Sequence, residues 1–141
     1  MAGFNVMPDL EAVVRKRIAD SGFNAYSSIP NSPSWPIAVV MRAGGVPAVR
    51  RYLDAARIQI DVWGGAKGDA TSIPKSTIQD MAQTIRVRVL ELEGTKVTTP
   101  VGAWISGVDD GSMIWLPDDT TGRDRYILTM EIFGRSLLPG E

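Results

Sequence analysis

The stretch RYILTMEIFGR, from Arg125 to Arg135, alternates between two sets of side chains at every position and so predicts a β-strand. One predicted face carries Tyr126, Leu128, Met130 and Ile132, and the other carries Ile127, Thr129, Glu131 and Phe133. A strand with a fully apolar face needs a second layer to bury that face. We therefore expect this strand to lie in a sheet that packs against helices.

Two earlier runs extend the predicted sheet. RIQIDVW, from Arg57 to Trp63, puts three aliphatic residues on one face, and its other face carries Arg57, Gln59, Asp61 and Trp63. IAVVM, at 37–41, is a short continuous apolar run, which is typical of a strand covered on both faces. Both runs therefore predict strands of the same sheet.

The chain after residue 96 also predicts β structure. Residues 97–108 alternate loosely, and a second short run follows at 113–116. The Asp110-Gly111 pair between these runs is a dipeptide typical of a hairpin turn. We therefore expect the chain to reverse at Asp110-Gly111.

Two helices are predicted from start signals and apolar spacing. The first runs from about 8 to 20, with a proline at its first position, and the second from about 74 to 92, with Thr71 and Ser72 as caps and Gly94 beyond its end. Their apolar stripes are Leu10, Val13, Val14 and Ile18 in the first helix, and Ile78, Met81, Ala82, Ile85, Val89 and Leu92 in the second.

This order of elements predicts an α+β fold, a mostly antiparallel sheet of about five strands packed with two helices. With 141 residues, we expect one domain, 1–141, whose core spans about 8–137. The segments between the elements are expected to be loops: a Pro-rich loop or edge piece at 23–36, a protruding loop at 44–54 and a Gly-rich loop at 64–72.

The composition excludes several classes of function. The chain has no cysteine and no histidine, so it lacks thiol chemistry, the commonest general base and the commonest transition-metal ligand. Its 15 Lys and Arg balance 16 Asp and Glu, which gives no electrostatic reason for tight nucleic-acid binding. No apolar run approaches the ~18 residues of a membrane span. We expect a protein that is not an enzyme and that has no cofactor, no metal and no membrane partner.

Two features could still bind ligands. In the Gly-rich loop, Lys67 precedes Gly68, and Asp69 stands where a phosphate-binding loop has its lysine, so a turn or a partner contact is the better interpretation. The acidic pairs Asp109-Asp110 and Asp118-Asp119 fit turn and loop chemistry. A small metal-dependent hydrolase that uses these four carboxylates remains the alternative from a different class.

Aromatic, basic and stray apolar residues predict surfaces for protein contact. The four tryptophans, at 35, 63, 104 and 115, favour core and interface packing over base stacking, because the chain carries no excess positive charge. Val87 and Leu90 lie on the far side of the second helix, where a helix on a sheet needs no apolar residue. The candidate interface residues are Arg50, Arg51, Tyr52, Trp63, Lys67, Val87, Leu90 and Arg125.

The segments IAVVMRAGG, ARIQIDVWGG followed by a helix, and RDRYILTMEIFGR give the chain a resemblance to a known family. From about residue 10 to 137, it resembles the tail terminator, or tail completion, proteins of long-tailed, siphovirus-type bacteriophages. The strand-then-helix unit at 58–92 and the Arg125-Tyr126 pair are especially similar.

The resemblance implies a structural virion protein at the head-tail interface, assembled in the host cytoplasm. Its copies would form a homo-oligomeric, hexameric ring that caps the tail tube, stops tube polymerisation and docks the head connector. Double-stranded DNA would slide through the lumen without specific binding, so we expect the lumen to be neutral or acidic, with Asp61 and Glu131 as candidate lumen-facing residues. A head-tail connector (stopper) or a tail tube subunit is the alternative within the same setting.

Overall fold

The computed structural model describes residues 7–49, 53–66, 73–138 and 140–141. It contains two helices and six strands. In chain order they are α1 (Leu10–Asp20), β1 (Asn24–Tyr26), β2 (Ile37–Val49), β3 (Leu53–Ala66), α2 (Lys75–Leu90), β4 (Thr95–Val97), β5 (Ala103–Trp115) and β6 (Arg123–Ser136). The α+β class predicted from the sequence is confirmed.

All six strands form one curled sheet in the order β1-β2-β3-β6-β5-β4. Every pair is antiparallel except β1 and β2, which run parallel through Asn24↔Ile37 to Tyr26↔Val39. The expected number of about five strands therefore becomes six, and the sheet is mixed. The runs expected at 97–108 and 113–116 form the single strand β5, and two short edge strands, β1 from the Pro-rich segment and β4, bring the number to six.

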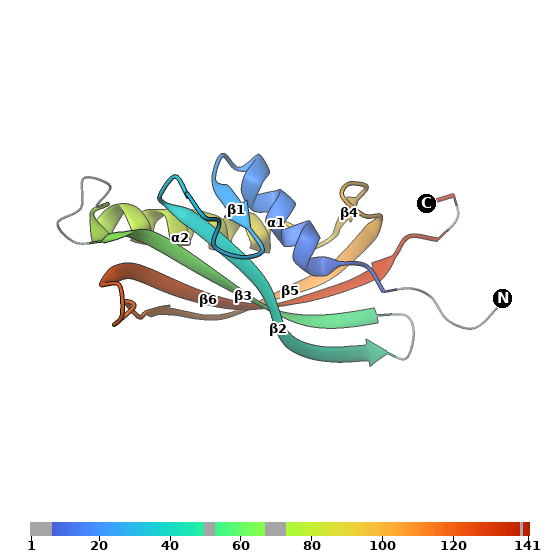
Figure 1. Cartoon of the computed structure of the whole chain (residues 1–141). Helices are drawn as coiled ribbons and strands as arrows, with labels where there is room; N and C mark the ends of the chain where they lie inside the picture. Colours follow the sequence, from blue (N-terminus) through green and yellow to red (C-terminus); the bar gives the residue numbers. More distant parts are fainter. Residues whose placement is uncertain (1–6, 50–52, 67–72, 139) are drawn as a thin grey trace.

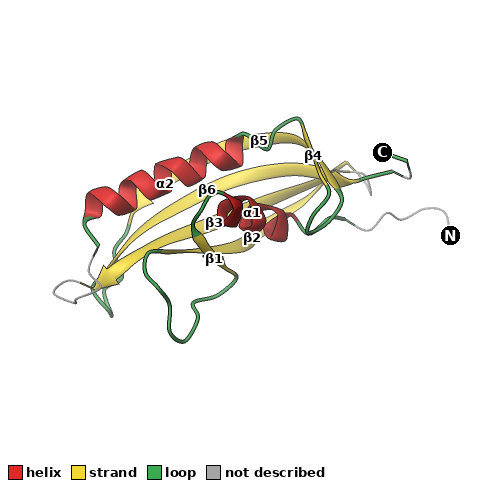
Figure 2. Ribbon diagram, turned by 90° about the horizontal axis from the view of Figure 1, so that it is seen from above, coloured by secondary structure: helices red, strands yellow, loops and turns green. Residues whose placement is uncertain are grey.

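Both helices lie on the same face of the sheet (Figures 1 and 2). Helix α1 begins after Asp9, whose carboxylate accepts a hydrogen bond from the Ala12 N–H at 3.0 Å, a standard N-cap. Helix α2 begins at Lys75 after Pro74 and has no side-chain cap; the predicted caps, Thr71 and Ser72, lie outside the described residues. Gly94 follows α2 with a φ of +74°, as predicted for a helix stop.

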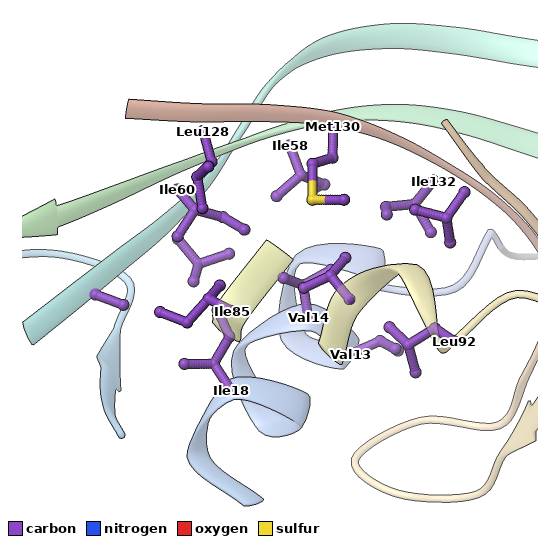
Figure 3. Close-up of a cluster of buried hydrophobic side chains, with 14 of the residues drawn as sticks. Val13, Val14, Ile18, Ile58, Ile60, Ile85, Leu92, Leu128, Met130 and Ile132 are labelled. Atoms are coloured by element: carbon purple, nitrogen blue, oxygen red, sulfur yellow. The ribbon is translucent and has the colours of Figure 1, made fainter. Parts of the chain in front are cut away.

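The core lies between the helices and the sheet, and Figure 3 shows its centre. The predicted stripes of both helices are buried there, together with the aliphatic face of β3 and the predicted inner face of β6. Ile58 and Ile60 of β3 face Ile85 of α2 and Val14 of α1 across this layer. Each fully buried aliphatic side chain stabilises the fold by roughly 1.5–3 kcal/mol through the hydrophobic effect.

The hairpin predicted at Asp110-Gly111 is wrong. β5 continues through this dipeptide as a single strand, and its pairing with β6 shifts by one residue between Asp110 and Ser112, which is a β-bulge. The chain reverses later, in the segment 117–122, where Gly122 has a φ of +69° and the Asp118 carboxylate accepts hydrogen bonds from Thr121. A β-bulge and a hairpin turn both favour residues such as Asp and Gly, so the local sequence does not distinguish the two structures.

The protruding loop predicted at 44–54 is also wrong. β2 runs on to Val49, and β3 starts at Leu53, so the two strands pair from Gly44↔Arg57 to Val49↔Leu53. This ladder carries the two strands away from the helices (Figure 1). The glycine pair marks another register shift, between Arg42 and Gly44, rather than a loop.

Neither described helix is long and apolar enough to cross a lipid bilayer.

Candidate functional site

The outer face of the sheet is the face turned away from α1 and α2, and it carries Asp61, Trp63, Arg125 and Glu131. Alternation puts these residues there, because their neighbours on β3 and β6 fill the core. Pairing between β3 and β6 then sets Trp63 opposite Arg125. The structure thus brings two of the predicted interface residues together with both predicted lumen residues on one surface.

Arginine–tryptophan stacking organises one end of the outer face. The Arg125 guanidinium lies 4.8 Å from the centre of the Trp63 ring, and Arg123 lies 4.1 Å from the centre of the Trp35 ring. Trp63 also joins Ile37 and Val39 in a second, smaller apolar cluster. Cation–π contacts of this kind contribute about 0.5–1 kcal/mol each at exposed sites. The predicted interface residue Trp63 is therefore buried, and Arg125 covers it.

The two candidate lumen residues differ in exposure. Asp61 is only 6% exposed, and its Oδ1 accepts a hydrogen bond from Gln59 Nε2 at 2.9 Å. Glu131 is half-buried and pairs across the ladder with Arg57, and across the other ladder with Asp109. Acidic and basic groups therefore alternate on this part of the outer face.

The helix residues of the candidate interface separate into two environments. Val87 on α2 is 47% exposed and points away from the sheet side, as its position predicted. Leu90 is partly buried and packs against the main core, so the expected apolar patch of Val87 and Leu90 reduces to one exposed side chain. Arg50, Arg51, Tyr52 and Lys67, the remaining candidates, lie outside the described residues.

One member of each acidic pair has a local partner. The Asp110 carboxylate forms an ion pair with Arg86 of α2, which raises the pKa of that arginine. Hydrogen bonds from the Thr121 side chain and backbone lower the pKa of Asp118. Across the described residues, no three acidic side chains come together in a way that could hold a metal ion.

Two open strand edges were missed by sequence reasoning. β1 pairs only with residues 37–39 of β2, and β4 pairs only with residues 103–105 of β5. Over the described residues, β2 from Val40 onward and β5 from Ser106 onward therefore have no strand beside them on their outer sides. These edges lie on opposite sides of the sheet, and unpaired edges invite pairing with another chain.

A glutamate covers one amide on each open edge. The Arg42 N–H of β2 donates to Glu11 Oε2 at 3.1 Å, and the Val108 N–H of β5 donates to Glu93 Oε1 at 3.1 Å. Glu11 comes from α1, and Glu93 from the turn after α2. No local pattern identifies these residues, since their partners lie in distant strands.

An ion pair between the exposed Arg42 and the buried Asp54 fixes β2 near its bulge. Both guanidinium ends of Arg42 donate to Asp54, which is 2% exposed, and the Nη2–Oδ1 distance is 2.8 Å. This interaction is the largest cause of the raised pKa of Arg42. The open edge of β2 is thus held to β3 by side chains as well as by the ladder.

Comparison with known proteins adds no relative. No protein-family model matches the sequence, and no curated protein matches it significantly.

Proposed function

We propose that this protein is a ring-forming tail terminator, a structural subunit that caps a phage tail tube and offers a docking surface for the head connector. The proposal starts from the resemblance of the segments 37–45, 56–65 and 123–135. The observation that carries it furthest is the pair of open, unlike strand edges on opposite sides of one sheet.

Two unlike edges suit a ring. When one edge of a subunit meets the other edge of the next, the contact is heterologous, and a rotation that divides a full turn evenly closes a ring. In this arrangement the β2 edge of one copy lies against the β5 edge of its neighbour. Main-chain hydrogen bonds between strands supply the contact, so no catalytic or cofactor-binding group is required.

The charge balance of the outer face suits a DNA channel. In the proposed ring the outer face lines the lumen, where three carboxylates offset three guanidinium groups: Asp61, Asp109 and Glu131 against Arg57, Arg123 and Arg125. A lumen rich in unpaired Lys and Arg would bind phosphates and slow the passage of DNA. The formal net charge of −1 for the whole chain fits this requirement.

Termination follows from surface mismatch. One end of the ring matches the growing tube, and the other end lacks the template that the tube protein recognises, so further addition gains too little binding energy. A tail tube subunit would present matching surfaces on both ends and would polymerise without limit. A stopper would bind the connector rather than the tube end.

Electron microscopy of the purified protein with and without tail tubes tests the proposal. Closed rings at tube ends are the expected result, whereas open-ended filaments of the protein alone would identify a tube subunit. A protein that stays monomeric and leaves tube ends bare would contradict the proposal.

A matched pair of variants tests the role of the β5 edge. Ile114 lies on this edge and is 51% exposed, and Leu138 lies beyond β6 and is 54% exposed. Because a lysine on an edge strand blocks strand pairing, Ile114→Lys should lower the fraction of rings at least fivefold. Leu138→Lys should leave that fraction unchanged, and equal effects of both variants would remove the β5 edge from the interface.

A further inference from the structure

A pocket beside the start of α2 contains a buried carboxylate without a partner. Asp124 of β6 is only 9% exposed, and within the described residues its carboxylate accepts no hydrogen bond and forms no ion pair. Neither carboxylate oxygen is sealed from water, and the residue lines a pocket of about 590 Å³. Because burial of an unpaired charge is unfavourable, a cation that enters this pocket is stabilised there.

The side chain of Asp124 points to the helix side of the sheet. It lies on the same face of β6 as Tyr126, which belongs to the main core. A Cβ placed on Gly64 of β3 would lie 3.6 Å from the Asp124 Cβ and 3.0 Å from the side chain of Ile78 in α2. The start of α2 and the turn between β5 and β6 lie at this same end of the sheet (Figure 1), and the pocket lies between them.

The residues that line the pocket give it a net negative charge. Among the described residues they supply three carboxylates, on Asp118, Asp119 and Asp124, against one ammonium group, on Lys75. The charge of Arg125 also reaches Asp118, but Arg125 is not part of the lining. The N-terminus of α2 adds only about half a positive charge. The lining therefore favours a cation over an anion.

The arrangement of the groups favours a guanidinium over a metal ion. Across the described part of the chain no three acidic side chains come close enough to hold a metal, whereas a guanidinium carries five N–H donors spread over a plane and can reach separated acceptors. Trp115 forms one wall, and the Lys75 ammonium lies 4.3 Å from the centre of its ring, so the ring already binds a cation. Arginine occupies such a position more often than lysine does.

We propose that this pocket, lined by Lys75, Trp115, Asp118, Asp119 and Asp124, binds an arginine side chain of a protein partner. The guanidinium donates to the Asp124 carboxylate and stacks on Trp115 in place of Lys75. This proposal does not depend on the proposed ring, because all of these residues belong to one subunit.

Titration followed by NMR tests the proposal directly. A ¹⁵N correlation spectrum records the indole N–H groups of the four tryptophans, and Trp115→Phe identifies the Trp115 signal. The probes are acetyl-Gly-Arg-Gly-amide and acetyl-Gly-citrulline-Gly-amide, whose neutral ureido group has nearly the shape of a guanidinium. We expect the Arg peptide to shift the Trp115 signal saturably and to bind at least fivefold more tightly than the citrulline peptide.

Variants separate the pocket from general charge attraction. Asp124→Asn should weaken binding of the Arg peptide at least fivefold, whereas Asp80→Asn, which removes the same charge from an exposed position of α2, should change it less than twofold. Lys75→Gln should tighten binding at least twofold, because it removes the competing cation from the Trp115 ring.

Three results would overturn the proposal: equal binding of the two peptides, an unmoved Trp115 signal, or a Trp115 shift that Ca²⁺ produces at a lower concentration than the Arg peptide. Weaker binding by Lys75→Gln would also contradict it. The comparison of the two peptides on the natural chain needs no variant, so a misfolded Asp124→Asn leaves the test intact.

Discussion

The carboxylate of Glu141 is the clearest case in which one side-chain contact sets a measurable property. Arg135 donates to both of its oxygens at 2.8 Å, and the Leu138 N–H donates to one of them. These hydrogen bonds, with that from Arg135 the largest cause, lower the pKa of Glu141 from 4.5 to about 2. A carboxylate whose pKa is lower in the folded state stabilises the fold above its unfolded pKa, and the contribution disappears as the pH falls toward the folded pKa. The affected window is therefore pH 4.5 down to about 2.

The titration of this carboxylate is the sharpest readout, since the group lies at the surface, where solvent screens its effect on stability. The ¹³C shift of the Glu141 carboxyl should titrate with a midpoint of about 2 in the natural chain. In Arg135→Gln the midpoint should rise toward 4.5, and in Arg15→Gln, whose arginine pairs with Glu11 instead, it should not move. A natural midpoint near 4.5 would show that Arg135 does not hold the carboxylate in solution.

At the scale of an element, the bulge of β5 depends on Gly111. A Cβ at this position would lie 2.1 Å from the carbonyl oxygen of Thr129 in β6, so a side chain forces the two strands apart. Gly111→Ala should lower the free energy of unfolding by about 2 kcal/mol, the usual cost of overpacking. Urea denaturation followed by tryptophan fluorescence measures this change.

Gly107 of the same strand is the matched control. A Cβ there meets Phe133 Cδ2 at 3.5 Å, an ordinary contact, so Gly107→Ala should stay within about 1 kcal/mol of the natural chain. If Gly107→Ala and Gly111→Ala lower the free energy of unfolding equally, the close approach of the two backbones is not the reason that position 111 needs glycine.

The same glycines explain how far the sequence predicts the fold. Periodicity predicted both helices, their buried stripes and the two faces of β6 correctly, because burial against one layer is a local pattern. The sequence also predicted a turn at Asp110-Gly111 and a protruding loop at 44–54, where the structure has continuous ladders with register shifts at Asp110/Ser112 and Arg42/Gly44. At Gly45, a Cβ would lie 2.0 Å from the carbonyl oxygen of Ala55. Only the partner strand distinguishes a bulge from a turn, and the sequence does not name that partner.

The candidate site was less predictable for the same reason. Alternation put Trp63 and Arg125 on faces of separate strands, but their contact depends on the register of β3 against β6. Leu90 packs against the core although its helical position is opposite the main stripe, a contact that the helical pattern alone does not predict. Glu11 and Glu93, which accept hydrogen bonds from the open edges, belong to no local sequence pattern that predicts these contacts.

At the scale of the whole molecule, the proposed ring gives the glutamates on the two edges a role in deciding when copies of the chain pair. In the proposed ring the β5 edge must give up the hydrogen bond between the Val108 N–H and Glu93 before that amide can pair with a neighbour. A carboxylate on an edge amide is one way in which proteins prevent unwanted strand pairing. Removing it should therefore favour association.

Glu93→Ala should form rings at a concentration at least fivefold lower than the natural chain, because the Val108 amide is then free to pair. Glu93→Gln is the matched control: its amide oxygen still accepts from Val108, so it should assemble close to the natural concentration. Sedimentation velocity over a concentration series measures both midpoints, and thermal melts check that both variants fold. If Glu93→Ala forms rings only at a higher protein concentration than the natural chain, Glu93 makes a contact within the ring and does not protect the free edge. The proposed pairing of the β5 edge would then be wrong.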